Sequence, residues 1–368
     1  MREVMIDTKE PLIIVHVMKN YEHKRGGIYN VVHNLLSYSA PNIRQYVMTN
    51  KSSVAASEPY VLHTQAQLNA IKPQIIHLHG MTGFSGKILR YLNKQKTSAC
   101  LVHSPHGHWH PYVQNERRFY KRWLANILYE RILFKRCSRY FVLTQQEIKN
   151  LKEKGAVGQF EIVLNGVDQD LLEFSKETYS KSLKRFPKKE NTLLFIGEVS
   201  PRKGVFKLVS TFQQKAPKDW RLDIYGPTPR HYENHLEAIK KLIGNDARIR
   251  LLPPIHGQEK YEAMLNAKLF CLPSVAEGLA LGPLEAATMG CKLLVSHACG
   301  YEGMEKGEVF YTYDQNSKEA LEKLLISMLN KPESFFEPDL DTIESLQSTL
   351  EWKTIIENYF ALYESSVS

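Results

Sequence analysis

Residues 271–300 read CLPSVAEGLALGPLEAATMGCKLLVSHACG, and their pattern is the clearest structural signal in the chain. An apolar run ends near Ser274, a glycine-containing loop follows, and a second apolar run covers 292–298. Proline favours the first position of a helix, so we expect a helix to begin at Pro283. Strand, loop, helix and strand in this order predict one repeat of a doubly wound α/β sheet.

The same alternation extends outward from this stretch over most of the chain. Runs that are apolar throughout suit parallel strands that are covered on both faces. These runs include PLIIVHVM (11–18), QIIHLHG (74–80), ACLVHSP (99–105), SRYFVLT (138–144), FEIVLNG (160–166), NTLLFIG (191–197), WRLDIYG (220–226) and RIRLLPP (248–254).

A polar stretch, 168–190, breaks the alternation and is expected to be a linker. We therefore predict two Rossmann-like domains over 1–168 and 190–349, each a doubly wound parallel sheet, and a length of 368 residues suits two domains. Ligands of such sheets bind beyond the carboxyl ends of the strands. Two such sheets facing each other would place these ends on both sides of one cleft.

The composition narrows the class of partner. A net charge of +9 suits a partner with phosphate groups: a nucleotide, a nucleic acid or an anionic membrane surface. The five cysteines form no CxxC pair, which favours a reducing, cytoplasmic compartment without disulfides. The N-terminus does not resemble a signal peptide, and no apolar run is long enough to span a bilayer.

Two glutamates are the first candidate site residues. Glu277 follows the strand that ends near Ser274, and its carboxylate could hold sugar hydroxyls. Glu285, expected in the first helical turn, could accept from two ribose hydroxyls, each bond contributing about 1.5–3 kcal/mol. Taken singly, Glu277 could be a solvated charge in a loop, and Glu285 could be an acid that is favourable beside the positive end of the helix dipole. Together with the glycine pattern and the helix N-terminus, they favour an anionic sugar ligand.

The stretch FIGEVSPRKG (195–204) supplies the second signal. Arg202 and Lys203 precede the next helix, and two cations beside a helix N-terminus suit a diphosphate. A carboxylate such as Glu198 about 4 Å from a phosphate would cost on the order of 4 kcal/mol. We therefore expect Glu198 either to turn away or to pair with Arg202. An exposed basic turn is the plainer alternative.

These segments resemble glycosyltransferase family 4. The stretch PSVAEGLALGPLEAATMG (273–290) is similar to the family's E-x7-E signature, and the run from SPHG (104–107) to LNGVD (164–168) resembles two further motifs. The resemblance extends from Gly26 to about Gly300. It implies the GT-B fold, which agrees with two sheets, and a C-terminal helix, 350–368, that joins the N-terminal domain.

The resemblance implies roles for the residues around the signature. The family's second Glu, here Glu285, holds the nucleotide ribose, and the first, here Glu277, touches the donor sugar. Loop amides at Gly278, Leu279 and Ala280 would touch the sugar and diphosphate. The family usually has Phe-Gly where this chain has Leu279-Ala280, so the Ala280 side chain narrows the approach of the backbone.

The basic loop matches the family in part. Lys203 corresponds to the family's lysine and is a catalytic candidate together with Glu277. Glu198 occupies the place of the family's arginine, and Arg202 is the candidate replacement.

A histidine-rich loop, 103–110, completes the set. By the resemblance, His106 points at the reactive side of the donor sugar, followed in our order by His108 and His103. So many imidazoles could hold zinc, but no carboxylate or cysteine joins them at ligand spacing, so we expect no metal. The remaining donor-binding candidates are Gly26, Gly27 and Asn165.

The segment 116–136 combines basic and aromatic residues. This composition suits an interfacial helix on anionic lipid, which would serve a lipid-linked acceptor. A core helix with a solvated basic face is the alternative.

The sequence thus predicts a hexosyltransferase that retains the anomeric configuration. It would use a UDP- or GDP-linked sugar as substrate, without a cofactor or metal, and a saccharide or lipid-linked acceptor. Capsule, exopolysaccharide or lipopolysaccharide synthesis are the expected pathways, at the inner face of the membrane or in the cytoplasm.

Other classes of protein fit less well. A dehydrogenase would need GxGxxG after a strand, and the chain has none. Its basic residues are spread along the chain without a nucleic-acid-binding motif. Two alternatives stay open: a non-catalytic sugar-nucleotide-binding partner subunit, favoured by Glu198 and Ala280, and a sugar-nucleotide epimerase of the same fold.

Overall fold

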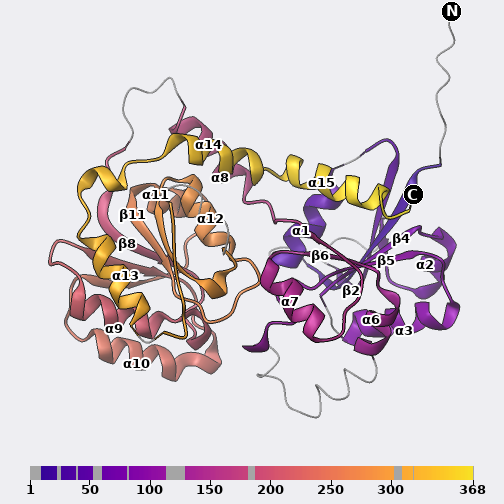
Figure 1. Cartoon of the computed structure of the whole chain (residues 1–368), viewed down its shortest axis with the longest axis horizontal. Helices are drawn as coiled ribbons and strands as arrows, with labels where there is room; N and C mark the ends of the chain where they lie inside the picture. The colour runs from indigo at the N-terminus through magenta and orange to yellow at the C-terminus, as the bar shows by residue number, and fades with distance from the viewer. Residues whose placement is uncertain are drawn as a thin grey trace, which may run out of the picture. The chain divides into compact units, whose positions relative to one another are not determined.

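The computed structural model divides into two compact units (Figure 1). The first unit comprises 1–164 and 353–368, and the second comprises 165–352. The residues that the structure describes are 10–22, 26–38, 40–52, 60–80, 83–112, 129–180, 187–301, 309–317 and 319–367.

The first unit is built on a parallel sheet with the strand order β3-β2-β1-β4-β5-β6-β7. Its strands are β1 (Leu12–Tyr21), β2 (Ile43–Ser52), β3 (Val61–Leu62), β4 (Ile75–His79), β5 (Cys100–Ser104), β6 (Arg139–Val142) and β7 (Gln159–Ile162). Its helices are α1 (Gly26–Ser37), α2 (Gln65–Ile71), α3 (Gly83–Gln95), α6 (Arg131–Arg136), α7 (Gln145–Glu153) and most of α15 (Trp352–Glu364). Every residue of β4 is buried, as expected for a strand covered on both faces.

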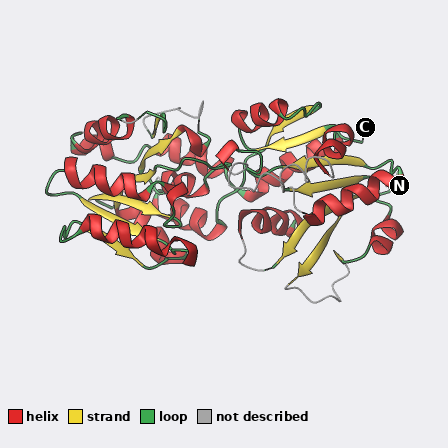
Figure 2. Ribbon diagram, turned by 90° about the horizontal axis from the view of Figure 1, so that it is seen from below, coloured by secondary structure: helices red, strands yellow, loops and turns green. Residues whose placement is uncertain are grey.

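The second unit repeats this plan with the strand order β10-β9-β8-β11-β12-β13. Its strands are β8 (Glu190–Ile196), β9 (Arg221–Tyr225), β10 (Ile249–Leu252), β11 (Ala267–Leu272), β12 (Lys292–Ser296) and β13 (Phe310–Tyr313). Its helices are α8 (Gln169–Thr178), α9 (Val205–Lys215), α10 (Glu233–Ile243), α11 (Gly257–Asn266), α12 (Leu281–Thr288), α13 (Ala320–Leu329) and α14 (Leu340–Thr349). Helices lie on both sides of the strands in each unit (Figure 2), so the prediction of two doubly wound parallel sheets is confirmed.

Each sheet has one point at which the direction of winding reverses. In the first unit it lies between β1 and β4, and in the second between β8 and β11. Ligands of open α/β sheets bind beyond the carboxyl ends of the strands at such a switch point. The fold alone therefore directs attention to the residues that follow these four strands.

The C-terminal helix α15 packs on the first unit through polar contacts. The Tyr363 hydroxyl lies 2.6 Å from Nδ1 of His77, and the Asn42 amide donates to Glu364 at 2.7 Å. Arg139 on β6 donates to the Ser365 carbonyl at 2.7 Å.

The expected linker, 168–190, is wrong over its first half. Residues 169–178 form α8, because the Asp168 side chain caps its N-terminus by accepting from the Asp170 amide. From this part of the chain, Ser175 donates to the Thr288 carbonyl at 2.5 Å, which fixes α8 on the second unit. Residues 181–186 lie outside the described ranges.

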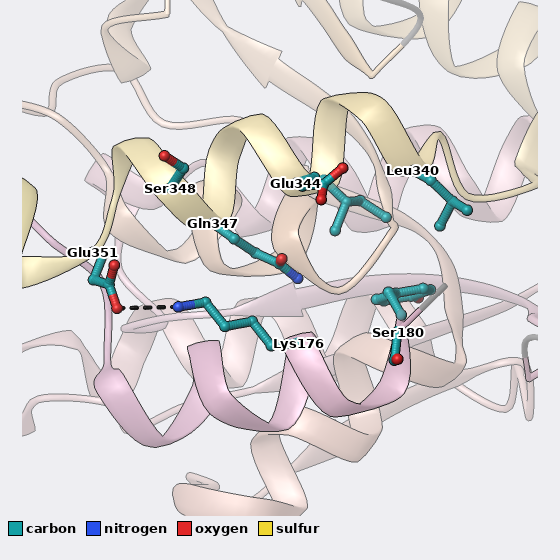
Figure 3. A pocket seen from close by; sticks show the side chains of 9 residues that line it. Lys176, Ser180, Leu340, Glu344, Gln347, Ser348 and Glu351 are labelled. Atoms are coloured by element: carbon teal, nitrogen blue, oxygen red, sulfur yellow. Dashed lines mark hydrogen bonds and ion pairs between the residues drawn. The ribbon is translucent and has the colours of Figure 1, made fainter. Parts of the chain in front are cut away.

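A groove of about 440 Å³ lies between α8 and α14 (Figure 3). Lys176 and Glu351, which form an ion pair of 3.0 Å, line this groove together with Gln347, whose side chain extends from α14 towards α8. The groove contains none of the predicted site residues.

Most of the predicted basic helix, 116–136, falls outside the described residues, which resume at 129. In the remainder, Leu133 is buried and Arg136 donates to the Thr97 carbonyl at 2.8 Å. No helix within the described ranges has the length and apolar character needed to cross a bilayer.

Gly204 joins the loop after β8 to α9 and has a positive φ of 72°. A Cβ atom at Gly204 would lie 2.2 Å from the Pro273 carbonyl oxygen. We expect Gly204→Ala to lower the free energy of unfolding by about 1–3 kcal/mol, because both the backbone and the contact become strained. Urea unfolding of the purified protein measures this change.

Gly282→Ala in α12 is the matched control, since its Cβ atom would meet the Phe270 ring at an ordinary 3.5 Å. Equal losses of stability in the two variants would contradict a special requirement for glycine at 204.

Candidate active site

The switch point of the second sheet is formed by two loops that are bonded to each other. The loop after β8 runs through the 3-10 turn Pro201–Lys203, and the loop after β11 begins at Pro273. The Val275 amide donates to the Arg202 carbonyl at 2.9 Å, which holds the two loops side by side. The predicted basic residues and the predicted acidic loop are therefore brought together by the sheet order.

Glu277 is the centre of this site. One carboxylate oxygen, Oε1, lies 2.8 Å from Arg202 and 2.8 Å from Nζ of Lys203, and it accepts from the Ser274 hydroxyl at 2.7 Å. Arg202 also donates to the Ala276 carbonyl at 2.8 Å, which anchors the guanidinium to the loop. The Glu277 side chain is only 11% exposed, whereas those of Lys203 and Arg202 are 15% and 29% exposed, so the carboxylate is better shielded from water than its cations.

The charges around Glu277 decide its protonation. Burial alone would raise the pKa of the carboxyl, but the Lys203 and Arg202 charges outweigh burial and hold the pKa below its usual value. Glu277 is therefore ionised at neutral pH, and it neutralises part of the basic pair in the free protein.

The expected pairing of Glu198 with Arg202 is wrong, because the Arg202 guanidinium is engaged by Glu277. Glu198 has no ion pair within the described ranges and is partly exposed. The other expectation, that Glu198 turns away, fits this arrangement.

Glu285 lies in the second turn of α12 rather than the first. The helix begins at Leu281, two residues before the predicted Pro283, with Ala280 as its N-cap. Oε1 of Glu285 accepts from Nζ of Lys260 on α11 at 3.0 Å. An acid this far into a helix gains little from the helix dipole, so the simple electrostatic explanation for Glu285 loses its basis.

The backbone amides between the two glutamates divide into two kinds. Those of Glu277 and Ala280 donate to the Ala298 and Cys299 carbonyls, at 3.1 and 3.3 Å. No acceptor for the amides of Gly278 and Leu279 occurs in the part of the chain described here. Of the three amides that the resemblance implies, these two are therefore the remaining candidates for a hydrogen bond to a ligand.

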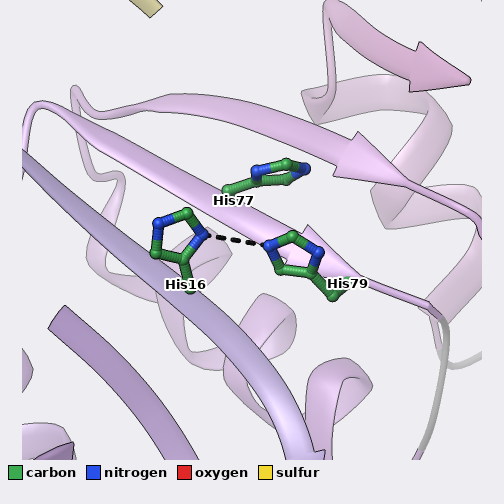
Figure 4. A group of neighbouring side chains, drawn as sticks. All are labelled: His16, His77 and His79. Atoms are coloured by element: carbon green, nitrogen blue, oxygen red, sulfur yellow. Dashed lines mark hydrogen bonds between the residues drawn. The ribbon is translucent and has the colours of Figure 1, made fainter. Parts of the chain in front are cut away.

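The switch point of the first sheet carries a histidine cluster. His16 on β1 pairs in register with His77 on β4, and His79 follows two residues later on the same face. All three are buried, and His16 Nδ1 lies 3.0 Å from His79 Nε2 (Figure 4). His106, from the loop after β5, joins the cluster with its Nε2 atom 3.1 Å from His79 Nδ1.

His103 lies apart from this cluster because of strand alternation. It pairs in register with Leu78, whose side chain points to the face opposite His77 and His79. Its Nδ1 atom lies 3.0 Å from the Leu78 carbonyl. His108 packs edge-on against the Trp109 ring at 4.9 Å between centroids.

Three of these imidazoles have the spacing of a metal site. Ligand atoms of His16, His77 and His79 lie within 4.8 Å of one another. However, both His77 nitrogens are already bonded, to Tyr363 at 2.6 Å and to Ser104 at 2.8 Å. His16 and His79 are bonded to each other, so the arrangement is that of a hydrogen-bonded cluster. The prediction that the chain binds no metal stays a prediction.

The remaining candidates are placed as follows. Gly26 and Gly27 begin α1, and a Cβ atom on Gly27 would meet nothing within 4 Å. Asn165 follows β7 and is 6% exposed, and its side-chain oxygen has no partner in the described ranges.

Sequence reasoning missed several residues of these two sites. Lys260, Ser274 and Gln45, whose side-chain oxygen lies 3.0 Å from Nε2 of His16, left no signal, because each acts through a partner that is distant in sequence or common in loops. His16, His77 and His79 did leave one, since each is a polar residue inside an otherwise apolar strand.

Comparison with known families identifies the chain. Residues 26–171 match the model described as Glycosyltransferase Family 4, and residues 176–338 match that of Glycosyl transferases group 1. The chain belongs to glycosyltransferase family 4. The sequence-based assignment to this family is confirmed.

Two curated relatives of this family member align over parts of their length. An uncharacterized glycosyltransferase of Haemophilus influenzae is 28% identical over 159 residues, 42% of this chain and 44% of that protein. The D-inositol 3-phosphate glycosyltransferase of Corynebacterium glutamicum is 23% identical over 243 residues, 62% of this chain and 57% of that protein. The chain thus spans about half the length of these relatives.

Solved structures agree in fold over nearly the whole chain. Sucrose-phosphate synthase from Thermosynechococcus elongatus has a TM-score of 0.72 at 16% identity, covering 96% of this chain and 98% of its own. HepE of Anabaena in complex with UDP and glucose has a TM-score of 0.69 at 13% identity, covering 96% and 100%. WaaG, a glycosyltransferase involved in lipopolysaccharide biosynthesis, has a TM-score of 0.63 at 17% identity, covering 94% and 98%. At these identities the likeness establishes a GT-B-like fold.

Proposed function

We propose that this family 4 member transfers a hexose from a nucleoside-diphosphate sugar to a saccharide or lipid-linked acceptor, with retention at the anomeric carbon. Family membership supports the class of reaction. The observation that carries the proposal is the pair of cations, Arg202 and Lys203, held on the Glu277 carboxylate at a sheet switch point.

In the proposed mechanism, the diphosphate of the donor binds to Lys203 and Arg202. Negative charge develops on this leaving group as the bond to the sugar breaks, and the two fixed cations stabilise it electrostatically. The amides of Gly278 and Leu279, for which the described part of the chain offers no acceptor, would add hydrogen bonds to the same groups. Together these residues would supply positive charge without requiring a bound metal.

The two glutamates would hold the two ends of the donor. Oε1 of Glu285 accepts from Lys260, so its second oxygen is the one left for ribose hydroxyls. Glu277, whose pKa is below its usual value in the free protein, would accept from hydroxyls of the hexose as a carboxylate at neutral pH. Ala280, Gly26, Gly27 and Asn165 remain proposed donor contacts of lesser weight.

The finer identity of the substrates is proposed by analogy. HepE was solved with UDP and glucose, which favours a uridine donor over a guanosine one. WaaG acts in lipopolysaccharide biosynthesis, which favours an acceptor of the cell-surface polysaccharide class. A cytoplasmic location, with peripheral contact to anionic lipid through 116–136, would suit a lipid-linked acceptor.

Donor binding tests the assignment of the cations. We expect Lys203→Met to weaken binding of UDP-glucose or GDP-mannose at least about tenfold, because one charge-assisted contact to the diphosphate is lost. Glu285→Ala should weaken binding by a similar factor through the ribose. Thermal-shift screening finds the donor that binds, and calorimetry measures its dissociation constant.

Lys207→Met is the matched control, because Lys207 lies on α9 and donates to the Ser317 carbonyl rather than to Glu277. Unchanged donor affinity in Lys203→Met and Glu285→Ala would remove both residues from the proposed site.

The stereochemical outcome tests the mechanism itself. With a binding donor and a saccharide acceptor, we expect the newly formed bond to keep the donor's anomeric configuration. Proton NMR of the product reads this directly from the anomeric coupling. An inverted product would sink the retaining mechanism, and donor isomerisation without acceptor would indicate an epimerase instead.

A further inference from the structure

The histidine cluster of the first unit is a chain of hydrogen bonds with one direction. It starts at Gln45 on β2, passes through His16 on β1 and His79 on β4, and ends at His106. The three links are 3.0, 3.0 and 3.1 Å long. Because each neutral imidazole has one donor and one acceptor nitrogen, the orientation of the first group determines all the others.

Gln45 sets this direction through its amide group. Its Nε2 atom donates to the Leu35 carbonyl at 2.5 Å and to the Tyr38 carbonyl at 3.3 Å. The Gln45 oxygen is therefore the atom that faces His16, and it can only accept. His16 must then carry its proton on Nε2, the nitrogen that lies 3.0 Å from that oxygen.

The remaining protons follow one by one. With Nε2 of His16 protonated, its Nδ1 atom is an acceptor, and His79 donates to it from Nε2. Nδ1 of His79 is then an acceptor for Nε2–H of His106. The Nδ1 atom of His106 is left with a lone pair, and no protein donor for it occurs in the described ranges.

These proton positions require neutral imidazoles, and burial keeps the imidazoles neutral. Desolvation lowers the pKa of His16 to about 4. The pKa of His106 is lowered to about 3, first by desolvation and second by electrostatic repulsion from His103. For His79, burial and then the neighbouring His77 hold the pKa well below its usual value. All three are uncharged at neutral pH.

The backbone also fixes the position of His106, the last residue in this series of hydrogen bonds. His106 has a φ of 51°, a left-handed conformation that costs a residue with a side chain on the order of 1–3 kcal/mol. The next amide, that of Gly107, donates to the buried Glu147 carboxylate at 2.6 Å and holds this turn in place. His106 is partly exposed, in contrast to His16 and His79.

We propose that Gln45, His16 and His79 are positioning residues that lock His106 in the Nε2–H tautomer, so that its Nδ1 atom serves as a fixed hydrogen-bond acceptor for a hydroxyl group of the bound sugar. The locked tautomer would reject a ligand that presents an acceptor at this point. The assignment of the hydroxyl to the donor sugar rests on the proposed function, whereas the tautomer does not.

Histidine NMR on the protein without ligand tests the lock directly. Long-range proton–nitrogen spectra distinguish a protonated from an unprotonated ring nitrogen, and the His106 signals are assigned by their loss in His106→Ala. We expect Nε2 protonated and Nδ1 unprotonated at pH 7. A His106 that carries its proton on Nδ1, or a mixture of both forms, would overturn the proposal.

Paired variants show whether the chain of bonds is responsible. His79→Leu removes the acceptor of the His106 proton, so a mixture of tautomers is expected, together with a loss of about tenfold or more in kcat/KM. His79→Asn places an amide oxygen near the position of Nδ1 and should restore the single tautomer and part of the activity. Circular dichroism confirms that each variant folds.

Tyr363→Phe is the matched control, because it removes a partner of the adjacent His77 but leaves the chain of bonds intact. It should leave the His106 tautomer unchanged. A tautomer that shifts equally in Tyr363→Phe and His79→Leu would indicate a general packing effect and contradict the proposal. If the purified protein instead contained stoichiometric zinc, EDTA would change the His16 and His79 signals. That result would show a metal site in place of the series of hydrogen bonds and would likewise contradict the proposal.

The outcomes separate this proposal from the proposed function. The expected tautomer in a protein that binds no nucleotide sugar would leave the lock standing and remove its assigned ligand. Donor binding and transfer with a mobile His106 tautomer would do the reverse.

Discussion

One partly buried ion-pair cluster lies where the two loops at the switch point of the second sheet meet. Arg202 and Lys203 share a single carboxylate oxygen of Glu277, which is 11% exposed. Two cations in such a place would be costly without a counter-ion, and the carboxylate would be costly without the cations. Each charge therefore offsets the cost of removing the others from water. The cluster also holds two positive charges at a place where a diphosphate could compete with the Glu277 carboxylate for them.

The switch points of the two sheets carry side chains of different chemical character. At the switch point of the second sheet the loops after β8 and β11 supply charge, and at that of the first sheet the strands β1 and β4 supply neutral imidazoles. Burial lowers the pKa of these histidines, so they are neutral and three adjacent imidazoles do not repel one another. At neutral pH the first switch point therefore carries uncharged imidazoles, and the second carries two cations around one carboxylate.

The fold was predictable because it depends on repeated patterns, whereas the roles of the candidate site residues stay predictions that rest on local ones. Apolar runs identified the strands, and the spacing of Glu277 and Glu285 identified the acidic loop. The partner of Arg202 was not predictable, because that pairing arises from the sheet order that brings two loops together. The start of α12 at Leu281 was missed because Pro283 is tolerated throughout a first turn. Gln45 was missed because only its contact with His16 distinguishes it from any other polar strand residue.

Proton linkage tests whether the diphosphate of a donor displaces Glu277 from its two cations. If the diphosphate of UDP-glucose takes Lys203 and Arg202 from Glu277, the pKa of this carboxyl rises from its lowered value in the free protein. Between the two pKa values the complex then holds more protons than its parts, so binding takes up protons and tightens as the pH falls. Calorimetry in two buffers of different ionisation enthalpy, at pH values below about 5, measures this uptake. We expect proton uptake in the wild-type protein and its loss in Glu277→Gln. Equal proton uptake in both proteins, or none in the wild type, would contradict it.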